Sequence, residues 1–442
     1  MVQLAIWLLV CGAVVWWWRS RIDLCVALVI VIWSLVPAVG GHHVIGISNS
    51  GIAFHPSSWL VLCIFAGQLF LNPTKIAATL ARHYLVILAV ALFALGALAT
   101  SMATGSGGTR LLIDQIVAPF LLWWLIVAFG SGRRRFAVVL RNAVLAAMAV
   151  QCVLALTQLA LDQIIFYAAD YERLTWFRPE TFDRWMGTAD SPLVLSLGVC
   201  VAAALAIGLR GSLLRFALLG LYLIATVITQ SRTGTAVLSA IIVYAIVRSR
   251  MAPWARVLAS AGVALLGFYL AGSAIFAGLA ARFENDTGSA NARALAFRFV
   301  FDNAGDFLFT GQGLISSYAI ARNAGLETSL ESSYLMYVID TGFVLATLYF
   351  GCQLLIVCRH GVQRSMPGVT LAAVVATLLQ HTFSAVAFAN FSGTLVWASL
   401  GLVVVAWTLP GVDLGAGPRS RPTLQASSSA RSGRTAVPVE RG

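Results

Sequence analysis

The chain has 442 residues, of which 60% are hydrophobic and 10% are charged, and its formal net charge is +12. A soluble protein of this length needs roughly twice that charged fraction to cover its surface. The composition therefore excludes a soluble enzyme, a nucleic-acid-binding domain and a disordered scaffold, and it predicts an all-α polytopic membrane protein. The positive charge requires no nucleic-acid partner, because basic residues that flank membrane spans produce the same surplus.

Thirteen apolar runs are long enough to cross a hydrocarbon layer roughly 30 Å thick. They begin near Leu4, Ile22, Ser58, Tyr84, Leu111, Phe136, Pro192, Leu213, Thr233, Trp254, Tyr334, Val369 and Phe391. Asp114 and Gln115 interrupt the fifth run, so we predict about 12–13 transmembrane helices. No basic segment precedes the first run and no small-residue cleavage site follows it, so we expect a span there and not a signal peptide.

The placement of basic residues predicts the orientation of these helices. The odd-numbered connections and the C-terminal tail hold 20 of the 29 Lys and Arg residues, and every odd connection is basic. Basic loops tend to stay in the cytoplasm. We therefore expect a multi-pass protein of the plasma membrane, with its N-terminus outside and its C-terminus in the cytoplasm.

Two of the even-numbered connections are long and polar. Six carboxylates lie from Asp162 to Asp190 and six more from Glu284 to Glu331, which together are 12 of the 17 in the chain. Long loops of this kind are usually functional or disordered, and the Trp and Phe residues between these charges favour packed structure. We predict a membrane domain over 1–409 whose working surface is extracytoplasmic, with loops at about 162–191 and 282–332. A disordered cytoplasmic tail is predicted over 410–442.

Arg232 departs from the orientation rule, because it lies in a very short outside connection with the sequence Thr-Gln-Ser-Arg-Thr-Gly at 229–234. A connection this short holds the cation at the membrane surface, where an unpaired charge is costly. A guanidinium group binds phosphate oxygens in a bidentate way, so a lipid diphosphate is one possible partner. The alternative is an arginine that extends to the lipid headgroups.

Arg293 and Glu331 lie in the second long loop. Apolar residues recur every three or four positions over 294–301, which predicts an amphipathic helix at the interface. The Gly-Gln-Gly sequence at 311–313 predicts a flexible turn. Glu331 precedes the eleventh apolar run, and on a helix it would share a face with Tyr334. Its carboxylate is either a proton acceptor or a helix-start carboxylate that interacts with the helix dipole.

Four segments in this order resemble the O-antigen ligase and polymerase superfamily of membrane glycosyltransferases. They are Arg-Trp-Met-Gly-Thr-Ala-Asp-Ser-Pro at 184–192, Gln-Ser-Arg-Thr-Gly at 230–234, Ser-Ala-Asn-Ala-Arg at 289–293 with the glycines of 311–313, and Glu-Ser-Ser-Tyr-Leu at 331–335 with Gly342. The last is similar to the family's His-Asn-x-Tyr-Leu sequence, with Glu331 where ligases carry a histidine. This departure favours a polysaccharide polymerase over a lipopolysaccharide ligase.

The resemblance implies a metal-independent, inverting glycosyltransferase without a cofactor. The donor is a glycan on undecaprenyl diphosphate, the acceptor is a second glycan, and the transfer occurs at the outer face of the lipid bilayer. The residues that the resemblance assigns to catalysis are Glu331, Arg232 and Arg293. Those that it assigns to substrate binding are Arg184, Ser231, Arg298 and Tyr334.

The alternative is a secondary transporter or a flippase for lipid-linked glycans. Such proteins place ionisable residues near the bilayer midplane, and the possible residues here are Asp114, Asp340 and His381. Asp340 and His381 can equally form a hydrogen-bonded structural pair, which is the interpretation we favour. A structural or sensory membrane protein is a third option, but it leaves the outside arginines unexplained.

Overall fold

The computed structural model describes residues 1–48, 50–174, 177, 183–248, 252–271, 287–326, 330–363 and 365–410. Every regular element in these residues is a helix and none is a strand, which confirms the all-α fold. The chain to residue 171 forms α1 (Val2–Trp17), α2 (Ile22–Leu35), α3 (Gly41–Ile45), α4 (Pro56–Leu71), α5 (Pro73–Arg82), α6 (Tyr84–Thr104), α7 (Thr109–Leu111), the π-helical η1 (Leu112–Val117), α8 (Ala118–Gly130), α9 (Arg134–Leu161) and α10 (Ala168–Tyr171).

The rest of the described chain forms α11 (Pro192–Ala206), α12 (Ser212–Ile228), α13 (Arg232–Arg248), α14 (Pro253–Ala271), α16 (Thr287–Asp302), α17 (Ser316–Asn323), α18 (Ser333–Thr341), α19 (Phe343–His360), α20 (Val369–Leu379) and α21 (Ser392–Thr408). Each of the predicted apolar runs starts close to the start of one of these helices. The eleventh run is divided at Gly342, whose φ of +94° ends α18 before α19 begins.

Helix length separates the possible spans into two classes. Four helical stretches within the described residues are long and apolar enough to cross a membrane alone: α6, the continuous stretch Thr109–Gly130, α9 and α19. α4 and α5 meet at 104° and count as a fifth only if the bent pair is one broken span and not a re-entrant loop. Six more apolar helices have 10–17 residues. A helix satisfies all its backbone hydrogen bonds within itself, which the interior of a bilayer requires. The protein is therefore a polytopic membrane protein, although many of its helices are shorter than a full span.

The odd-numbered connections meet at one end of the helix bundle. The ring centroids of His83 and His360 are 5.9 Å apart, and Arg141 donates to the carbonyl of Gly208 at 3.0 Å. The backbone N–H of Gly132 donates to the hydroxyl of Thr408 at the end of α21. We call this end the basic end, because it carries Arg21, Arg133, Arg141, Arg256 and Arg359.

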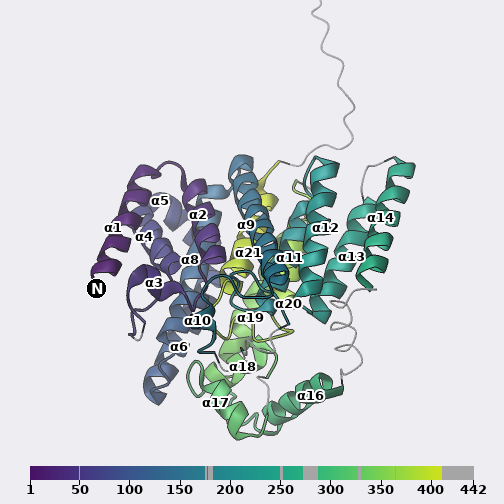
Figure 1. Cartoon of the computed structure of the whole chain (residues 1–442). Coiled ribbons are helices and arrows are strands. Elements are labelled where there is room, and N and C mark those ends of the chain that lie inside the picture. The colour runs from purple at the N-terminus through teal and green to yellow at the C-terminus, as the bar shows by residue number, and fades with distance from the viewer. Residues whose placement is uncertain are drawn as a thin grey trace, which may run out of the picture.

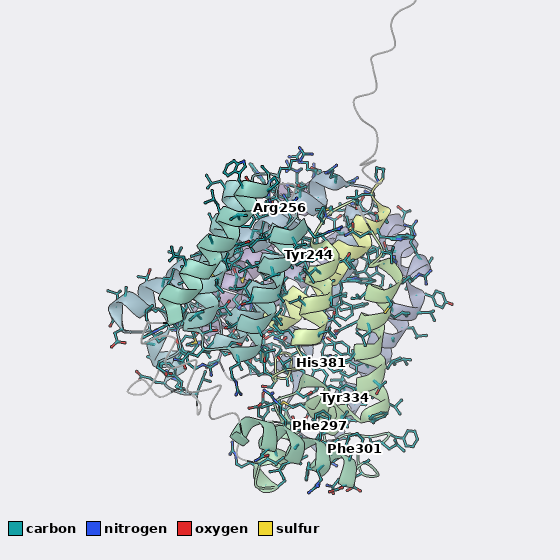
Figure 2. All side chains as sticks on the ribbon, turned by 90° about the vertical axis from the view of Figure 1, so that its right-hand side faces the viewer. Tyr244, Arg256, Phe297, Phe301, Tyr334 and His381 are labelled. Atoms are coloured by element: carbon teal, nitrogen blue, oxygen red, sulfur yellow. The ribbon has the colours of Figure 1, made fainter. Side chains whose placement is uncertain are left out.

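The even-numbered connections meet at the opposite end, which carries α3, α10, α16 and α17 and is called the loop end (Figure 1). Here Arg110 donates to the carbonyl of Ala38 at 2.8 Å, and the N–H of Ala38 donates to the Asp190 carboxylate at 2.6 Å. Figure 2 shows Phe297 and Phe301 at the loop end and Arg256 near the basic end. The predicted separation of the two sets of connections is confirmed, and the compartment that each end faces stays a prediction.

Aromatic packing holds the centre of the bundle together. Trp123 of α8 and Trp397 of α21 are fully buried, and their rings meet edge to face with centroids 6.0 Å apart. The indole N–H of Trp397 donates to the hydroxyl of Tyr349 in α19 at 3.1 Å. Buried aromatic rings with a satisfied polar atom contribute both packing and specificity. This core fixes the helices whose ends form the site described below.

Candidate functional site

Two glutamines of α9 hold the segment that precedes α11. Gln158 exchanges two hydrogen bonds with the backbone of Gly187, at 2.7 and 2.8 Å. Gln151 accepts from the N–H of Thr188 at 2.8 Å. Both glutamines are buried, and a buried amide needs such partners. Neither glutamine was predicted from the sequence to have a role, although two glutamines seven residues apart in one apolar span are a signal for a polar contact.

Arg184 and the connection before Arg232 are brought together by this arrangement. The Nε of Arg184 donates to the carbonyl of Thr229, the C-cap residue of α12, at 3.0 Å. The side-chain amide of Gln230 donates to the carbonyl and the carboxylate of Asp183 at 3.1 and 3.0 Å. Gln230 has a φ of +51°, which is uncommon for a residue other than glycine. The two predicted segments, which lie 45 residues apart between Arg184 and Thr229, form one surface at the loop end.

Ser231 caps the helix that Arg232 begins. Its hydroxyl accepts from the N–H of Gly234 at 3.2 Å, the usual N-cap bond to the third helical residue. A Cβ at Gly234 would overlap the buried hydroxyl of Ser196 in α11, so this glycine allows the two helices to approach closely. Arg232 is half-buried at the N-terminus of α13. A cation there gains nothing from the helix dipole, so helix stability does not explain it.

Arg293 and Glu331 form an ion pair. The Nε of Arg293 donates to Oε2 of Glu331 at 2.9 Å, and the side chains are 41% and 24% exposed. On α16, Arg293 shares a helical face with Ala296 and Val300, which are buried. The structure therefore directs this arginine toward the start of α18 and joins two of the three predicted catalytic residues.

Glu331 lies outside α18, which begins at Ser333. Its φ is +47° and Ser332 is the N-cap residue, so the prediction that Glu331 and Tyr334 share a helical face is wrong. Ser333 anchors the helix start: its hydroxyl donates to the carbonyl of Gln380 at 2.8 Å and accepts from the N–H of Val386 at 3.1 Å. Because the helix begins two residues later than that prediction requires, the Glu331 carboxylate is directed to α16.

Tyr334 belongs to an aromatic group on α18, α19 and the segment after α20. Its ring meets those of Phe350 and His381, with centroids 5.9 and 6.4 Å away, and Figure 2 shows it between Phe297 and His381. Its hydroxyl is hydrogen-bonded to that of Thr347 at 2.9 Å. The ring is half-exposed, so Tyr334 has a packing role and still reaches the surface of the loop end.

The segment that follows α16 is docked on the end of α18. The N–H groups of Gln312 and Gly313 donate to the carbonyls of Ile339 and Asp340 at 2.9 and 2.8 Å. A Cβ at Gly311 would overlap the backbone of Asp340, so only glycine fits this approach. The flexible turn predicted at 311–313 is therefore wrong, because backbone hydrogen bonds fix it.

Asp340 completes this docking. Its carboxylate accepts from the N–H groups of Ile315 and Ser317 at 3.1 and 2.7 Å, which orders the start of α17. His381 packs instead on Phe350, with ring centroids 4.6 Å apart, and its buried Nδ1 has no hydrogen-bond partner within the described residues. The pairing predicted between Asp340 and His381 is therefore wrong.

Arg298 lies on a different face of α16 from Arg293. The two residues are five positions apart, and Arg298 is exposed, as are the large apolar side chains of Leu295, Phe297 and Phe301 on the same helix. Exposed apolar residues on a helix at the end of a membrane bundle are typical of an interfacial helix. The helix predicted over 294–301 is confirmed, and the structure does not bring Arg298 to the Arg293–Glu331 pair.

One group within the described residues has the spacing to hold a metal ion: His42 and His43 of α3 with Asp170 of α10. Nε2 of His43 lies 2.7 Å from Asp170 Oδ2, and Nε2 of His42 lies 3.6 Å from Oδ1. Arg173 is also 3.6 Å from Oδ1. The hydrogen bond between His43 and Asp170 and the nearby guanidinium of Arg173 thus account for this group as a link between α3 and α10. A reaction without a metal stays a prediction.

Comparison with known proteins identifies the domain that contains most of these residues. Residues 216–350 match the O-antigen ligase family, a stretch from α12 to α19 that includes Arg232, Arg293 and Glu331 and leaves Arg184 outside. No curated protein matches the chain. The match confirms the resemblance drawn from the motifs at 230–234, 289–293 and 331–335. Over residues 216–350, this polytopic membrane protein is therefore similar to the O-antigen ligase family, which supports the O-antigen ligase and polymerase superfamily.

Proposed function

We propose that this protein is a glycosyltransferase that moves a glycan from undecaprenyl diphosphate onto an acceptor glycan at the outer face of the plasma membrane. In the proposed orientation the loop end and the N-terminus face outside, and the basic end and the C-terminus face the cytoplasm. The Arg293–Glu331 pair carries the proposal. It joins, within the family match, a cation suited to phosphate and a carboxylate suited to accepting a proton.

The proposed reaction is a single displacement at the anomeric carbon of the donor sugar. The oxygen of an acceptor hydroxyl bonds to that carbon, while the bond between the carbon and the diphosphate oxygen breaks. The electron pair of the broken bond leaves with undecaprenyl diphosphate, and the hydroxyl proton passes to the Glu331 carboxylate. Attack opposite to the leaving group inverts the anomeric centre. Guanidinium groups neutralise the leaving diphosphate, so the step requires no metal ion.

Arginine geometry supports this division of roles. Arg293 uses Nε for Glu331, and its two terminal nitrogens have no hydrogen-bond partner within the described residues. These nitrogens form the planar fork that binds phosphate oxygens in a bidentate way. We assign Arg293 and Arg232 to the diphosphate, with Arg184 beside the connection that precedes Arg232.

The remaining site residues contribute in other ways. Ser231 supports the helix start that carries Arg232. We assign Tyr334, which is half-exposed, and Arg298, which is exposed, to contacts with a glycan at the loop end. Neither takes part in the displacement.

A polymerase is favoured over a ligase because Glu331 stands where the resemblance leads one to expect a histidine. The buried acids that raised the transporter alternative have structural partners. Asp114 accepts from the N–H of His55 at 2.9 Å and lies 3.5 Å from Arg110, while Asp340 holds the start of α17. These contacts account for both acids without a transport pathway.

The proposal is tested with the purified full-length chain in lipid vesicles, supplied with an undecaprenyl-diphosphate-linked oligosaccharide. A polymerase lengthens the glycan on the lipid and releases free undecaprenyl diphosphate, and it does so in the presence of EDTA. Transfer that requires a second, different acceptor supports a ligase instead. Movement of the intact lipid-linked glycan across the vesicle membrane, with no cleavage, contradicts the proposal and supports the flippase.

A further inference from the structure

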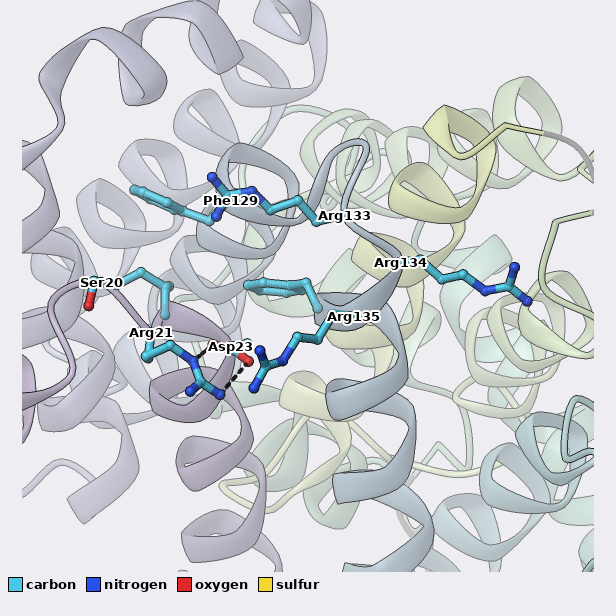
Figure 3. A pocket seen from close by; sticks show the side chains of 9 residues that line it. Ser20, Arg21, Asp23, Phe129, Arg133, Arg134 and Arg135 are labelled. Carbon is cyan, nitrogen blue, oxygen red and sulfur yellow. Dashed lines mark hydrogen bonds and ion pairs between the residues drawn. The ribbon is translucent and has the colours of Figure 1, made fainter.

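A pocket opens at the basic end, on the side of the bundle away from the candidate site. It lies between the α1–α2 turn and the α8–α9 turn and has a volume of about 380 Å³. Arg21 and Asp23 line it from one turn, and Arg133, Arg134 and Arg135 line it from the other. In Figure 3, Arg135 extends toward the Arg21–Asp23 pair and Arg134 extends away from it.

The charges in this pocket are not balanced. Asp23 pairs with Arg21 through two hydrogen bonds at 3.1 and 3.2 Å, so this carboxylate and this guanidinium neutralise each other. Within the described residues no carboxylate oxygen lies within 4.0 Å of Arg133 or Arg135. The ammonium of Lys75 adds a further cation 5.1 Å from the ring of Phe129, which also lines the pocket.

Helix stability does not explain these arginines. Arg134 and Arg135 are the first residues of α9, whose first turn has no acidic residue, and a helix N-terminus is the positive end of its dipole. The orientation rule explains cations on this side of the membrane. It does not require Arg133 and Arg135 of the α8–α9 turn to line one concave space together with the Arg21–Asp23 pair of the α1–α2 turn. A bound anion would offset the repulsion between them.

Aromatic residues place the pocket at the level of the lipid headgroups. Trp16 and Trp17 at the end of α1 are 67% and 82% exposed, and the guanidinium of Arg19 lies 4.5 Å from the ring of Trp16. Exposed Trp next to Arg is typical of the interface between a membrane and water. The α1–α2 turn that carries Arg19 continues directly into Ser20 and Arg21 of the pocket.

We propose that this pocket binds the phosphate of an anionic phospholipid headgroup, with Arg133 and Arg135 as its main contacts. Their planar guanidinium groups suit the oxygens of a phosphodiester, and basic pockets between membrane helices commonly hold anionic headgroups. Phe129 and Phe136 supply an apolar wall beside them. The site is separate from the residues assigned to glycan transfer and does not depend on that proposal.

The test measures lipid binding to the full-length chain in detergent by native mass spectrometry, with short-chain phosphatidylglycerol as the probe. Phosphatidylcholine is the zwitterionic comparison, and inorganic phosphate and glycerol phosphate are the soluble competitors. The pocket variant is Arg133→Gln with Arg135→Gln. The control variant removes two exposed arginines outside the pocket, Arg82→Gln with Arg248→Gln. A second pocket variant, Arg133→Lys with Arg135→Lys, keeps the charges that set the orientation.

We expect phosphatidylglycerol to bind about tenfold or more tightly than phosphatidylcholine, and the glutamine pocket variant to lose most of that preference, because it removes charge-assisted hydrogen bonds. The control variant should keep the preference. An equal loss in both variants means that charge at this end attracts lipid without a site, and it overturns the proposal. Competition by free phosphate at the affinity of the lipid also overturns it, in favour of a soluble anion. If the glutamine variant fails to insert, weakened lipid binding in the lysine variant supports the proposal and unchanged binding overturns it.

Discussion

Replacing Glu331 with glutamine separates a proton acceptor from a structural ion-pair partner. The pair with Arg293 is 41% and 24% exposed, and pairs this exposed contribute about 0–1 kcal/mol to stability. Glutamine keeps an oxygen that accepts from the Arg293 Nε, so the free energy of unfolding should fall by about 1 kcal/mol or less. Loss of general-base catalysis, by contrast, reduces turnover about 10²–10⁴-fold. That factor raises the barrier by about 3–5.5 kcal/mol, well above the cost in stability.

The assay is glycan extension under single-turnover conditions, with thermal unfolding and donor binding measured on the same preparations. Glu172→Gln is the matched control, because Glu172 is exposed at the end of α10 in the other long connection at the loop end. Arg293→Lys keeps the charge, loses the fork, and should lower donor affinity as well as turnover. Turnover of Glu331→Gln close to that of Glu172→Gln would refute the reasoning, and Glu331 would then only position Arg293.

Three further outcomes are expected. Arg232→Lys should insert and fold normally but lose most of its activity, because lysine cannot bind a diphosphate in a bidentate way; full activity would mean that Arg232 only contacts lipid headgroups. Cysteines introduced at Ser289 and Ser429, in a background without native cysteines, should react with impermeant reagents from opposite sides of the membrane, and labelling of both from outside would contradict the orientation. Gly311→Ala should lower the free energy of unfolding by about 1–3 kcal/mol, measured by thermal unfolding, because its Cβ would overlap the backbone of α18. Gly305→Ala, which has open space around it, should cost much less, and equal effects would contradict the docking of this segment.

The sequence alone was sufficient to predict the fold class and the positions of the helices. The bilayer imposes two local requirements, an apolar run of sufficient length and a backbone that satisfies its own hydrogen bonds. Both can be recognised without knowing any contact, so the predicted runs and the observed helices begin at nearly the same places. Each span carries the chain to the other end of the bundle, so successive connections lie at alternate ends. The separation of basic and acidic connections can therefore also be predicted without knowing any contact.

The list of site residues could be proposed from sequence, but their grouping could not. Arg293 and Glu331 are 38 residues apart, and no periodicity relates them. Their contact depends on how α16 docks on α18, which the close approach at Gly311 and the carboxylate of Asp340 determine. Residues 327–329 lie just before Glu331 and outside the described chain.

Helix boundaries account for the remaining differences. The residues Glu-Ser-Ser-Tyr at 331–334 fit a helix that starts at either Glu331 or Ser333, because charged and hydroxyl residues are both common in the first turn. Ser333 is bound to the segment after α20, and this long-range contact selects the later start. Tertiary hydrogen bonds from Ser333 to residues 47 or more positions away therefore decided which of the two helix starts the chain adopts. The composition and charge of the chain, in contrast, were enough to determine that it is a helical membrane protein, because the bilayer acts on each segment independently.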